Sequence, residues 1–149
     1  MSSLALDTAR SVLSAVPVLM RTVGHTVRES GGDVSPQQHR ILTLLARSPR
    51  TLGEVARIQG VTPATITTTI TTMENRGWVG RESDPSDRRR VVVTITEEGR
   101  AAFASTQKVV EQAIARLLEP LSDTELLTVG KGFDSVRDLG ERERVQRKR

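Results

Sequence analysis

Seven threonines lie within the eleven residues 62–72, and three consecutive arginines, Arg88 to Arg90, follow in a polar turn. A threonine side chain carries a hydroxyl group that donates or accepts a hydrogen bond and a methyl group that can contact the methyl of a thymine base. An arginine guanidinium suits phosphate oxygens and the narrow minor groove of A·T-rich DNA. Residues of these types in this order predict contacts with a nucleic acid.

The excess positive charge of the chain lies in the same segment. The protein has 149 residues and a formal net charge of +4. Residues 36–95 carry nine basic and five acidic groups, residues 1–35 carry three of each, and residues 96–149 carry ten of each. Such a confined excess is typical of a nucleic-acid-binding module. A solvated basic surface is the alternative, and charge alone does not exclude it.

Capping signals predict three helices in the middle of the chain. Ser35 and Thr51 each begin a capping box, with glutamine or glutamate three residues later. Thr62 precedes a proline at the first helical position. A tight turn containing Gly60 separates the helices that begin after Thr51 and Thr62, which predicts a helix-turn-helix.

The threonine-rich segment has strand-like composition, so its assignment as a helix rests on spacing. Helical spacing places Ile66, Ile70 and Met73 on one face, whereas strand alternation would separate Met73 from the isoleucines. The outward surface is then centred near Thr68 and is expected in the major groove. No lysine or arginine precedes Arg76 in this helix, so we expect modest direct readout of bases. The alternative is that the threonines only coat a solvent face, where Glu, Lys, Gln or Ala are more common.

A hairpin is expected after this helix, because residues 78–83 and 90–95 have strand patterns and flank a polar turn with proline. An arginine at its tip could enter a narrow minor groove. Asp87 is expected to hold an arginine fork by a bidentate pair. The alternative is a solvated hairpin with salt bridges among Asp87, Arg88 and Arg90.

Long helices are expected on both sides of this segment. Apolar stripes predict a helix over about Leu4–Glu29, kinked at Pro17, and further helices that begin at Thr96 and Ser122. The charged tail Glu141–Arg149 is expected to fray. These stripes are larger than a small winged domain could cover, which predicts a two-fold homodimer.

Together the elements predict a mainly α fold with a small β-hairpin, a winged helix-turn-helix of order α-α-α-α-β-β-α-α with a helical dimerisation region. The DNA-binding domain is expected over residues 35–96, and the dimerisation region over residues 1–34 and 97–149.

Other classes of protein find little support. The chain has no cysteine, which removes disulfides, thiolate metal sites and thiol redox sensing. We find no phosphate-cradling glycine motif, nucleophile elbow or metal-ligand cluster, so no enzyme, metal site or cofactor is expected. The N-terminus lacks a signal-peptide pattern and no stretch approaches a membrane span, which predicts a cytoplasmic protein without a membrane partner.

The chain resembles the MarR family of bacterial transcriptional regulators over about Ser35–Gly99. The resemblance rests on Arg76-Gly-Trp-Val79, Asp84-Pro-Ser-Asp-Arg-Arg-Arg90 and Val93-Thr-Ile-Thr-Glu-Glu-Gly99. It implies a homodimeric regulator that binds a palindromic operator in double-stranded DNA through recognition helices in the major groove and wings in the minor groove. We expect a repressor, and whether binding represses or activates stays open at this point.

The family's wing pattern Asp-x-Arg matches Asp87 and Arg89, which implies that Arg89 enters the minor groove while Arg88 and Arg90 contact phosphates. Which arginine enters the groove stays open at this point. The expected DNA contacts are Thr62, Pro63, Ala64, Thr65, Thr67, Thr68, Thr72, Arg76, Asp87, Arg88, Arg89 and Arg90.

The resemblance also implies a small aromatic or anionic effector that relieves DNA binding. The candidate residues lie near the junction of the first two helices: Arg21, His25, Arg28, His39 and Arg40. The alternative is that the two histidines make ordinary helix-end or interhelix hydrogen bonds. The alternative function for the whole chain is a helical protein-interaction module whose winged-helix fold does not bind DNA specifically.

Overall fold

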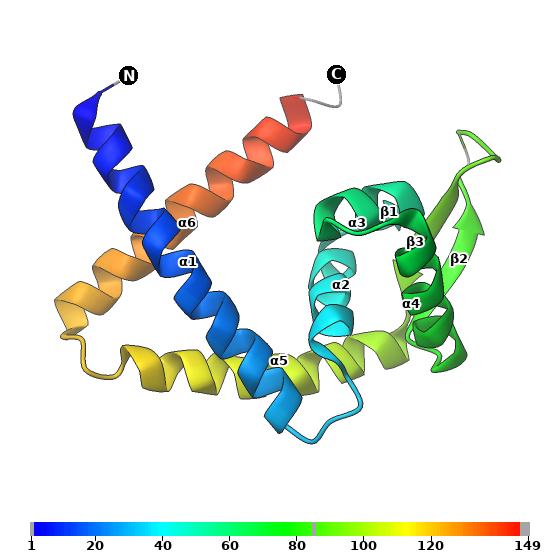
Figure 1. The fold of residues 1–149 in the computed structure, drawn as a ribbon, viewed down its shortest axis with the longest axis horizontal. Coiled ribbons are helices and arrows are strands. Elements are labelled where there is room, and N and C mark those ends of the chain that lie inside the picture. The colour runs from blue at the N-terminus through cyan, green and yellow to red at the C-terminus, as the bar shows by residue number, and fades with distance from the viewer. Residues whose placement is uncertain (1, 85, 147–149) are drawn as a thin grey trace. The chain divides into compact units, whose positions relative to one another are not determined.

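The computed structural model describes residues 2–84 and 86–146. Its elements are α1 (Ser3–Glu29), α2 (Pro36–Arg47), β1 (Arg50–Thr51), α3 (Leu52–Gln59), α4 (Pro63–Asn75), β2 (Val79–Ser83), β3 (Val91–Ile95), α5 (Glu97–Leu118) and α6 (Asp123–Gln146) (Figure 1). The chain divides into two compact units, residues 1–113 and 114–149. The predicted fold class is confirmed.

The sheet has three antiparallel strands in the order β1-β3-β2, one more than the sequence predicted. The predicted hairpin pairs Val79 with Ile95 at one end and Ser83 with Val91 at the other. The added strand β1 has only two residues and pairs Arg50 with Val93. A two-residue strand is too short to show an alternation of apolar and polar residues in the sequence. It is recognised only by its pairing with β3. Figure 1 shows α2, α3 and α4 gathered beside this sheet, with the β2–β3 turn projecting from it.

The predicted caps are all present. The Ser35 and Thr51 capping boxes are formed in both directions, and the Thr62 side chain accepts the backbone N–H of Thr65. Gly60 ends α3 with a φ of 65°, in the left-handed region that glycine adopts without strain. These local bonds fix the turn between α3 and α4.

The core of the first unit is mainly aliphatic, with Trp78 among its buried members, and lies among α2, α3, α4, β2 and β3. Ile66, Ile70 and Met73 are each 0% exposed, as their helical spacing predicts. They belong to one cluster with residues of the neighbouring elements, including Ile41 of α2 and Val93 of β3. The cluster therefore fixes which face of α4 points outward.

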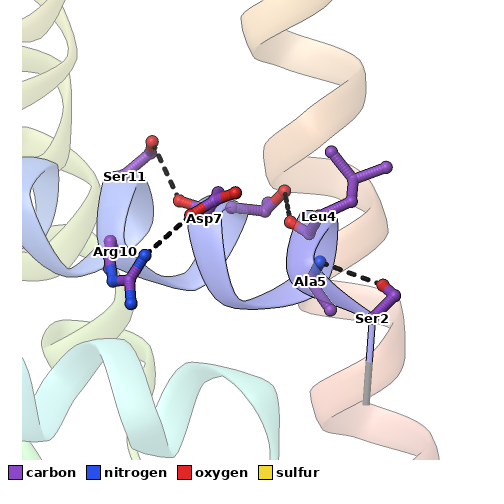
Figure 2. Close-up of polar contacts among 7 residues, drawn as sticks. Ser2, Leu4, Ala5, Asp7, Arg10 and Ser11 are labelled. Atoms are coloured by element: carbon purple, nitrogen blue, oxygen red, sulfur yellow. Dashed lines mark hydrogen bonds and ion pairs between the residues drawn. The ribbon is translucent and has the colours of Figure 1, made fainter.

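Helix α1 is continuous over 27 residues, with Pro17 inside it. Figure 2 shows how its first turns are held: the Ser2 hydroxyl accepts the N–H of Ala5, and Asp7 pairs with Arg10 at 2.7 Å. Among its described residues only Val27 is buried. Most side chains of α1 are therefore exposed in the single chain.

The expectation that no stretch approaches a membrane span is wrong for α1. By length and composition, this helix could cross a membrane, with a mean hydropathy of 1.2 over an 18-residue window. The cause is the uncharged stretch 11–20 between Arg10 and Arg21. A core helix or a signal sequence passes the same test, so length and composition do not distinguish among these roles.

Helix α6 begins as predicted. Ser122 and Glu125 form reciprocal hydrogen bonds. The Ser122 N–H donates to a Glu125 carboxylate oxygen at 2.9 Å, and the Glu125 N–H donates to the Ser122 hydroxyl at 3.4 Å. The helix continues through Gln146, so the predicted fraying of the tail from Glu141 is wrong as far as residue 146. Residues 147–149 lie outside the described part of the chain.

Gly99 in the first turn of α5 lies directly against the backbone of Trp78. A Cβ atom at Gly99 would lie 2.0 Å from the Trp78 carbonyl oxygen and 2.8 Å from its carbonyl carbon. The same oxygen accepts the N–H of Thr96 at 3.1 Å. The start of α5 can therefore reach the hairpin only if residue 99 has no side chain.

We expect Gly99→Ala to lower the free energy of unfolding by about 1–3 kcal/mol, the usual cost of overpacking. Gly130→Ala is the matched control, because a Cβ at this α6 position meets nothing within 4 Å. It should be neutral or stabilising by about 0.5–1 kcal/mol through helix propensity. Urea unfolding of both variants checks this, and equal stabilities would contradict the close approach.

Candidate nucleic-acid interface

The outward face of α4 carries exposed threonines, including Thr68 at its centre. Five threonine hydroxyls of this helix donate to the carbonyl oxygen four residues earlier. These bonds are Thr67 to Pro63 (2.9 Å), Thr68 to Ala64 (3.2 Å), Thr69 to Thr65 (3.0 Å), Thr71 to Thr67 (2.8 Å) and Thr72 to Thr68 (3.1 Å). The side chains are thereby held in fixed orientations along the helix.

The N-terminus of α4 is exposed at Thr62, Pro63 and Ala64. The Thr62 hydroxyl accepts the N–H of Thr65 at 3.2 Å and lies 2.9 Å from the Thr65 hydroxyl. The first amides of a helix and its dipole create a partial positive charge that favours phosphate oxygens. This end of α4 is thus suited to an approach to the DNA backbone.

Arg81 is a residue that the sequence reasoning missed. Its guanidinium extends from β2 to α4, where Nη2 donates to the Thr71 hydroxyl at 2.6 Å and to the Thr67 carbonyl at 3.3 Å. Its Nε lies 3.3 Å from a Glu74 carboxylate oxygen. Arg81 therefore couples the hairpin to the threonine-rich helix. Its partners lie ten or more residues away in most cases, so no local pattern predicts them.

Arg76, an expected DNA contact, has partners inside the protein. Its guanidinium donates to the Asp33 carbonyl oxygen and lies 4.9 Å from the centre of the Trp78 ring. Cation–π contact and the hydrogen bond hold the side chain against the loop before α2. A phosphate contact by Arg76 would have to share or replace these interactions.

The turn between β2 and β3 is organised by Asp84. Its carboxylate accepts the N–H of Ser86 at 2.9 Å and the Ser86 hydroxyl at 2.6 Å. These two bonds are the main cause that lowers the pKa of Asp84. The Asp84 N–H donates to the Arg90 carbonyl at 2.9 Å and closes the turn. Residues 86–90 are exposed.

The expected role of Asp87 as partner of an arginine fork is wrong in its mechanism. Its carboxylate accepts the backbone N–H of Arg89 at 3.0 Å. Within the described residues no ion pair joins it to Arg88 or Arg90, so the alternative salt-bridged turn is also not formed. An aspartate side chain is short and reaches the backbone two residues on more readily than a guanidinium. The three exposed arginines are therefore not tied to Asp87, while the charge of Arg90 contributes to the lowered pKa of Asp84.

A groove of about 550 Å³ lies between the start of α3 and the wing. It brings Arg57 of α3, which the sequence reasoning missed, to the same hollow as Arg89 and Arg90. The other lining residues are Thr51, Leu52, Gly53, Glu54 and Val91. The basic surface therefore continues from the wing to α3, although Glu54 adds one carboxylate to it.

The five candidate effector residues differ in exposure and in their partners. His25 is exposed, with its Nε2 3.2 Å from a Glu29 carboxylate oxygen, and Arg40 donates to the Gln59 side chain at 3.2 Å. Arg21 and Arg28 are exposed. Within the described residues no hydrogen bond or ion pair joins any two of the five side chains. The contact of His25 with Glu29 agrees with the alternative of ordinary helix-end contacts.

His39 differs from the other four, because it is only 4% exposed and its ring centre lies 5.8 Å from that of Phe103. Burial lowers its pKa below 6.5, the hydrogen bond with Gln107 acts in the opposite direction, and the charge of Arg40 lowers the pKa further. Its Nε2 has no hydrogen-bond partner in the structure. Burial between α2 and α5 therefore favours the neutral form of the imidazole.

Comparison with known proteins agrees with this geometry. A family model for the MarR family matches residues 32–90. The transcriptional regulator HosA of Escherichia coli O111:H- is 34% identical over 95 residues, which cover 62% of this chain and 70% of that protein. The HTH-type transcriptional repressor Rv2887 of Mycobacterium tuberculosis H37Rv is 35% identical over 82 residues, covering 54% of this chain and 59% of that protein.

Solved structures show the same fold. Wild-type MarR from E. coli in its apo form matches with a TM-score of 0.71 at 22% identity, over 86% of this chain and 94% of that one. The transcriptional regulator BldR from Sulfolobus solfataricus matches with a TM-score of 0.65 at 23% identity, over 92% of this chain and 99% of that one.

The fold and the exposed surface of α4 and the wing define a winged helix-turn-helix protein. The chain belongs to the MarR family and is a transcriptional regulator, not an enzyme.

The buried His39 predicts a dependence of stability on pH. Because its pKa is lowered in the folded protein, the unfolded chain binds the proton more readily once the pH falls below 6.5. The contribution of neutral His39 to the free energy of unfolding is fully present above pH 6.5. It is lost as the pH falls through the pKa of His39 in the folded protein. Urea unfolding at pH 7.5 and 5.5 should show a smaller loss for His39→Gln than for the unchanged protein. An equal loss in both would contradict this account.

Proposed function

We propose that the protein is a homodimeric DNA-binding repressor that recognises a palindromic operator through α4 in the major groove and the β2–β3 wing in the minor groove. The observation that carries the proposal is the pairing of two exposed features on one compact unit. These are the threonine face of α4 and a wing turn that carries three exposed arginines. The name of the relative Rv2887 as a repressor supports the direction of regulation.

The proposed DNA contacts divide by chemistry. The exposed residues at the start and along the outward face of α4 would meet base edges and one phosphate: Thr62, Pro63, Ala64, Thr65, Thr67, Thr68 and Thr72. In the wing, Arg89 would enter the minor groove, and Arg88 and Arg90 would contact phosphates. Asp87 would contribute by fixing the backbone at Arg89, the bond that the structure contains. Arg76 remains a proposed contact that its internal partners restrain.

Homodimerisation is proposed because the long helices leave large apolar side chains uncovered in the single chain. On α1, Leu4 is 74% exposed and Leu13 is 71% exposed; on α6, Leu127 is 64% exposed and Leu139 is 61% exposed. Burial of such side chains is the main driving force for association. We propose residues 1–34 and 97–149 as the dimerisation region and residues 35–96 as the DNA-binding domain. A partner protomer, and not a membrane, would then cover the apolar surface of α1.

The expected location in the cytoplasm and the expected effector differ in how well they are supported. A regulator that acts on chromosomal DNA would work in the cytoplasm. The effector proposal gains no support from geometry, since the candidate side chains have separate partners and separate exposure. Relief of binding by a small aromatic or anionic ligand therefore rests on family resemblance.

If the protein binds DNA, its affinity should depend steeply on salt concentration, and the wing arginines should account for part of this dependence. On a labelled fragment of the DNA upstream of the protein's own gene, affinity should fall steeply between 50 and 200 mM salt, by about 10³-fold or more if six or more phosphates are contacted. Arg89→Ala should bind more weakly by about tenfold or more. Arg10→Ala on α1 removes the same charge and should bind like the unchanged protein. Negligible affinity at low salt with an intact dimer would favour the protein-interaction alternative.

Asp87→Asn separates the two mechanisms for the wing. Asparagine keeps a side-chain oxygen that can accept the Arg89 N–H, and it removes a negative charge that repels phosphate. This variant should bind DNA at least as tightly as the unchanged protein. A clear loss of affinity would indicate that the carboxylate holds a guanidinium after all.

The apolar side chains of the long helices predict the oligomeric state. Leu13→Glu and Leu127→Glu should each weaken the dimer, because a charge would have to be buried on association. Analytical ultracentrifugation should show a dimer for the unchanged protein and a larger monomer fraction for both variants. Val91→Glu, at an exposed position of β3, is the control and should stay dimeric. A monomer in the unchanged protein at micromolar concentration would contradict the proposal.

A further inference from the structure

The outward threonines of α4 have used most of their hydrogen-bond donors within the helix. The hydroxyls of Thr68 and Thr72 donate to the carbonyls of Ala64 and Thr68. A hydroxyl has a single hydrogen, so neither side chain keeps a donor for a base. Thr62 and Thr65 share one bond between their hydroxyls at 2.9 Å, which uses one of their two hydrogens. At most one free donor therefore remains among these four exposed threonines.

These bonds also fix what the side chains present. A threonine is β-branched and stiff at its first side-chain dihedral, and in a helix its hydroxyl bond to a preceding carbonyl selects the rotamer. The side chain then offers oxygen lone pairs and a methyl group. Donation to a base would require each threonine to release its own helix carbonyl first.

Apart from the amide of Asn75 in its last turn, α4 has no other side chain that could supply the missing donors to this face. Residues 63–75 contain no lysine and no arginine. The guanidinium of Arg81, which extends to α4 from β2, donates to Thr71 and lies beside Glu74. Because guanine presents two acceptors in the major groove, its usual bidentate partner is an arginine or a lysine. The middle of α4 lacks that chemistry.

We propose that α4 recognises A·T base pairs in the major groove through the methyl group of thymine and the amino group of adenine. The inference rests on the proposed DNA-binding function and names the base pairs that this surface selects. An A·T pair offers a methyl group to a threonine methyl and an N6 amino donor to a threonine lone pair. A G·C pair offers one amino donor, two acceptors and no methyl. Thr68 and Thr72 are the residues that determine this preference.

The test uses the whole protein and synthetic DNA duplexes. Binding sites are first selected from a random duplex library, and the best site is then made with uracil in place of thymine at the half-site positions. Uracil lacks only the 5-methyl group, so pairing and charge are unchanged. We expect A·T pairs at these positions and a loss of affinity of about threefold to fourfold for each contacted methyl. Uracil placed in the flanking DNA is the control and should have no effect.

Two variants at one position assign the effect to its side chain. Thr68→Ser removes the methyl and keeps the hydroxyl, and it should reduce the difference between thymine and uracil. Thr68→Val keeps a methyl and removes the hydroxyl, and it should retain that difference. Thr128→Ser on α6 is the matched control, since Thr128 makes the same bond to a carbonyl four residues earlier, at 2.8 Å.

The possible results separate the two levels of the proposal. If no duplex is bound with salt-dependent affinity, the proposed function fails and this inference fails with it. If duplexes are bound but thymine and uracil sites have equal affinity, or guanine is selected at the half-site positions, only the inference is overturned. Thymine preference that Thr68→Ser leaves unchanged would overturn the assignment to Thr68.

Discussion

Burial of one face of α4 is the constraint on which the proposed DNA surface depends. Ile66, Ile70 and Met73 are 0% exposed, and burying each is worth about 1.5–3 kcal/mol. Threonine costs about 0.6 kcal/mol relative to alanine inside a helix, so the six threonines within α4 cost about 4 kcal/mol together. The three buried side chains outweigh this cost. Once their face is fixed against the core, Thr68 and Thr72 must face outward.

Elements with local causes could be predicted from the sequence. The caps at Ser35, Thr51 and Thr62 need only residues three positions apart, and the spacing of the buried face of α4 distinguishes helix from strand. The tail beyond Glu141 was misjudged because charge was taken as a sign of fraying, although its residues continue the helix to Gln146.

Features with non-local causes could not be predicted. Strand β1 exists only as a partner of β3, and Arg81 finds Thr71 and Glu74 only after the hairpin packs on α4. The bond of Asp87 to the Arg89 N–H differs from these, because it spans only two residues and is a local turn bond that aspartate favours. For the DNA-facing residues, the sequence could indicate which side chains are exposed, but only the structure shows that their hydroxyl hydrogens are already in use.

Hydrogen–deuterium exchange of the dimer with and without its operator duplex tests the central claim most directly, because it reports on the backbone of both proposed contact regions at once. The account predicts slower exchange in residues 62–72 and 86–90 on DNA binding, with little change over α6. Slower exchange confined to α1 and α6, with α4 and the wing unchanged, would contradict the assignment of α4 and the wing as the DNA-binding surface.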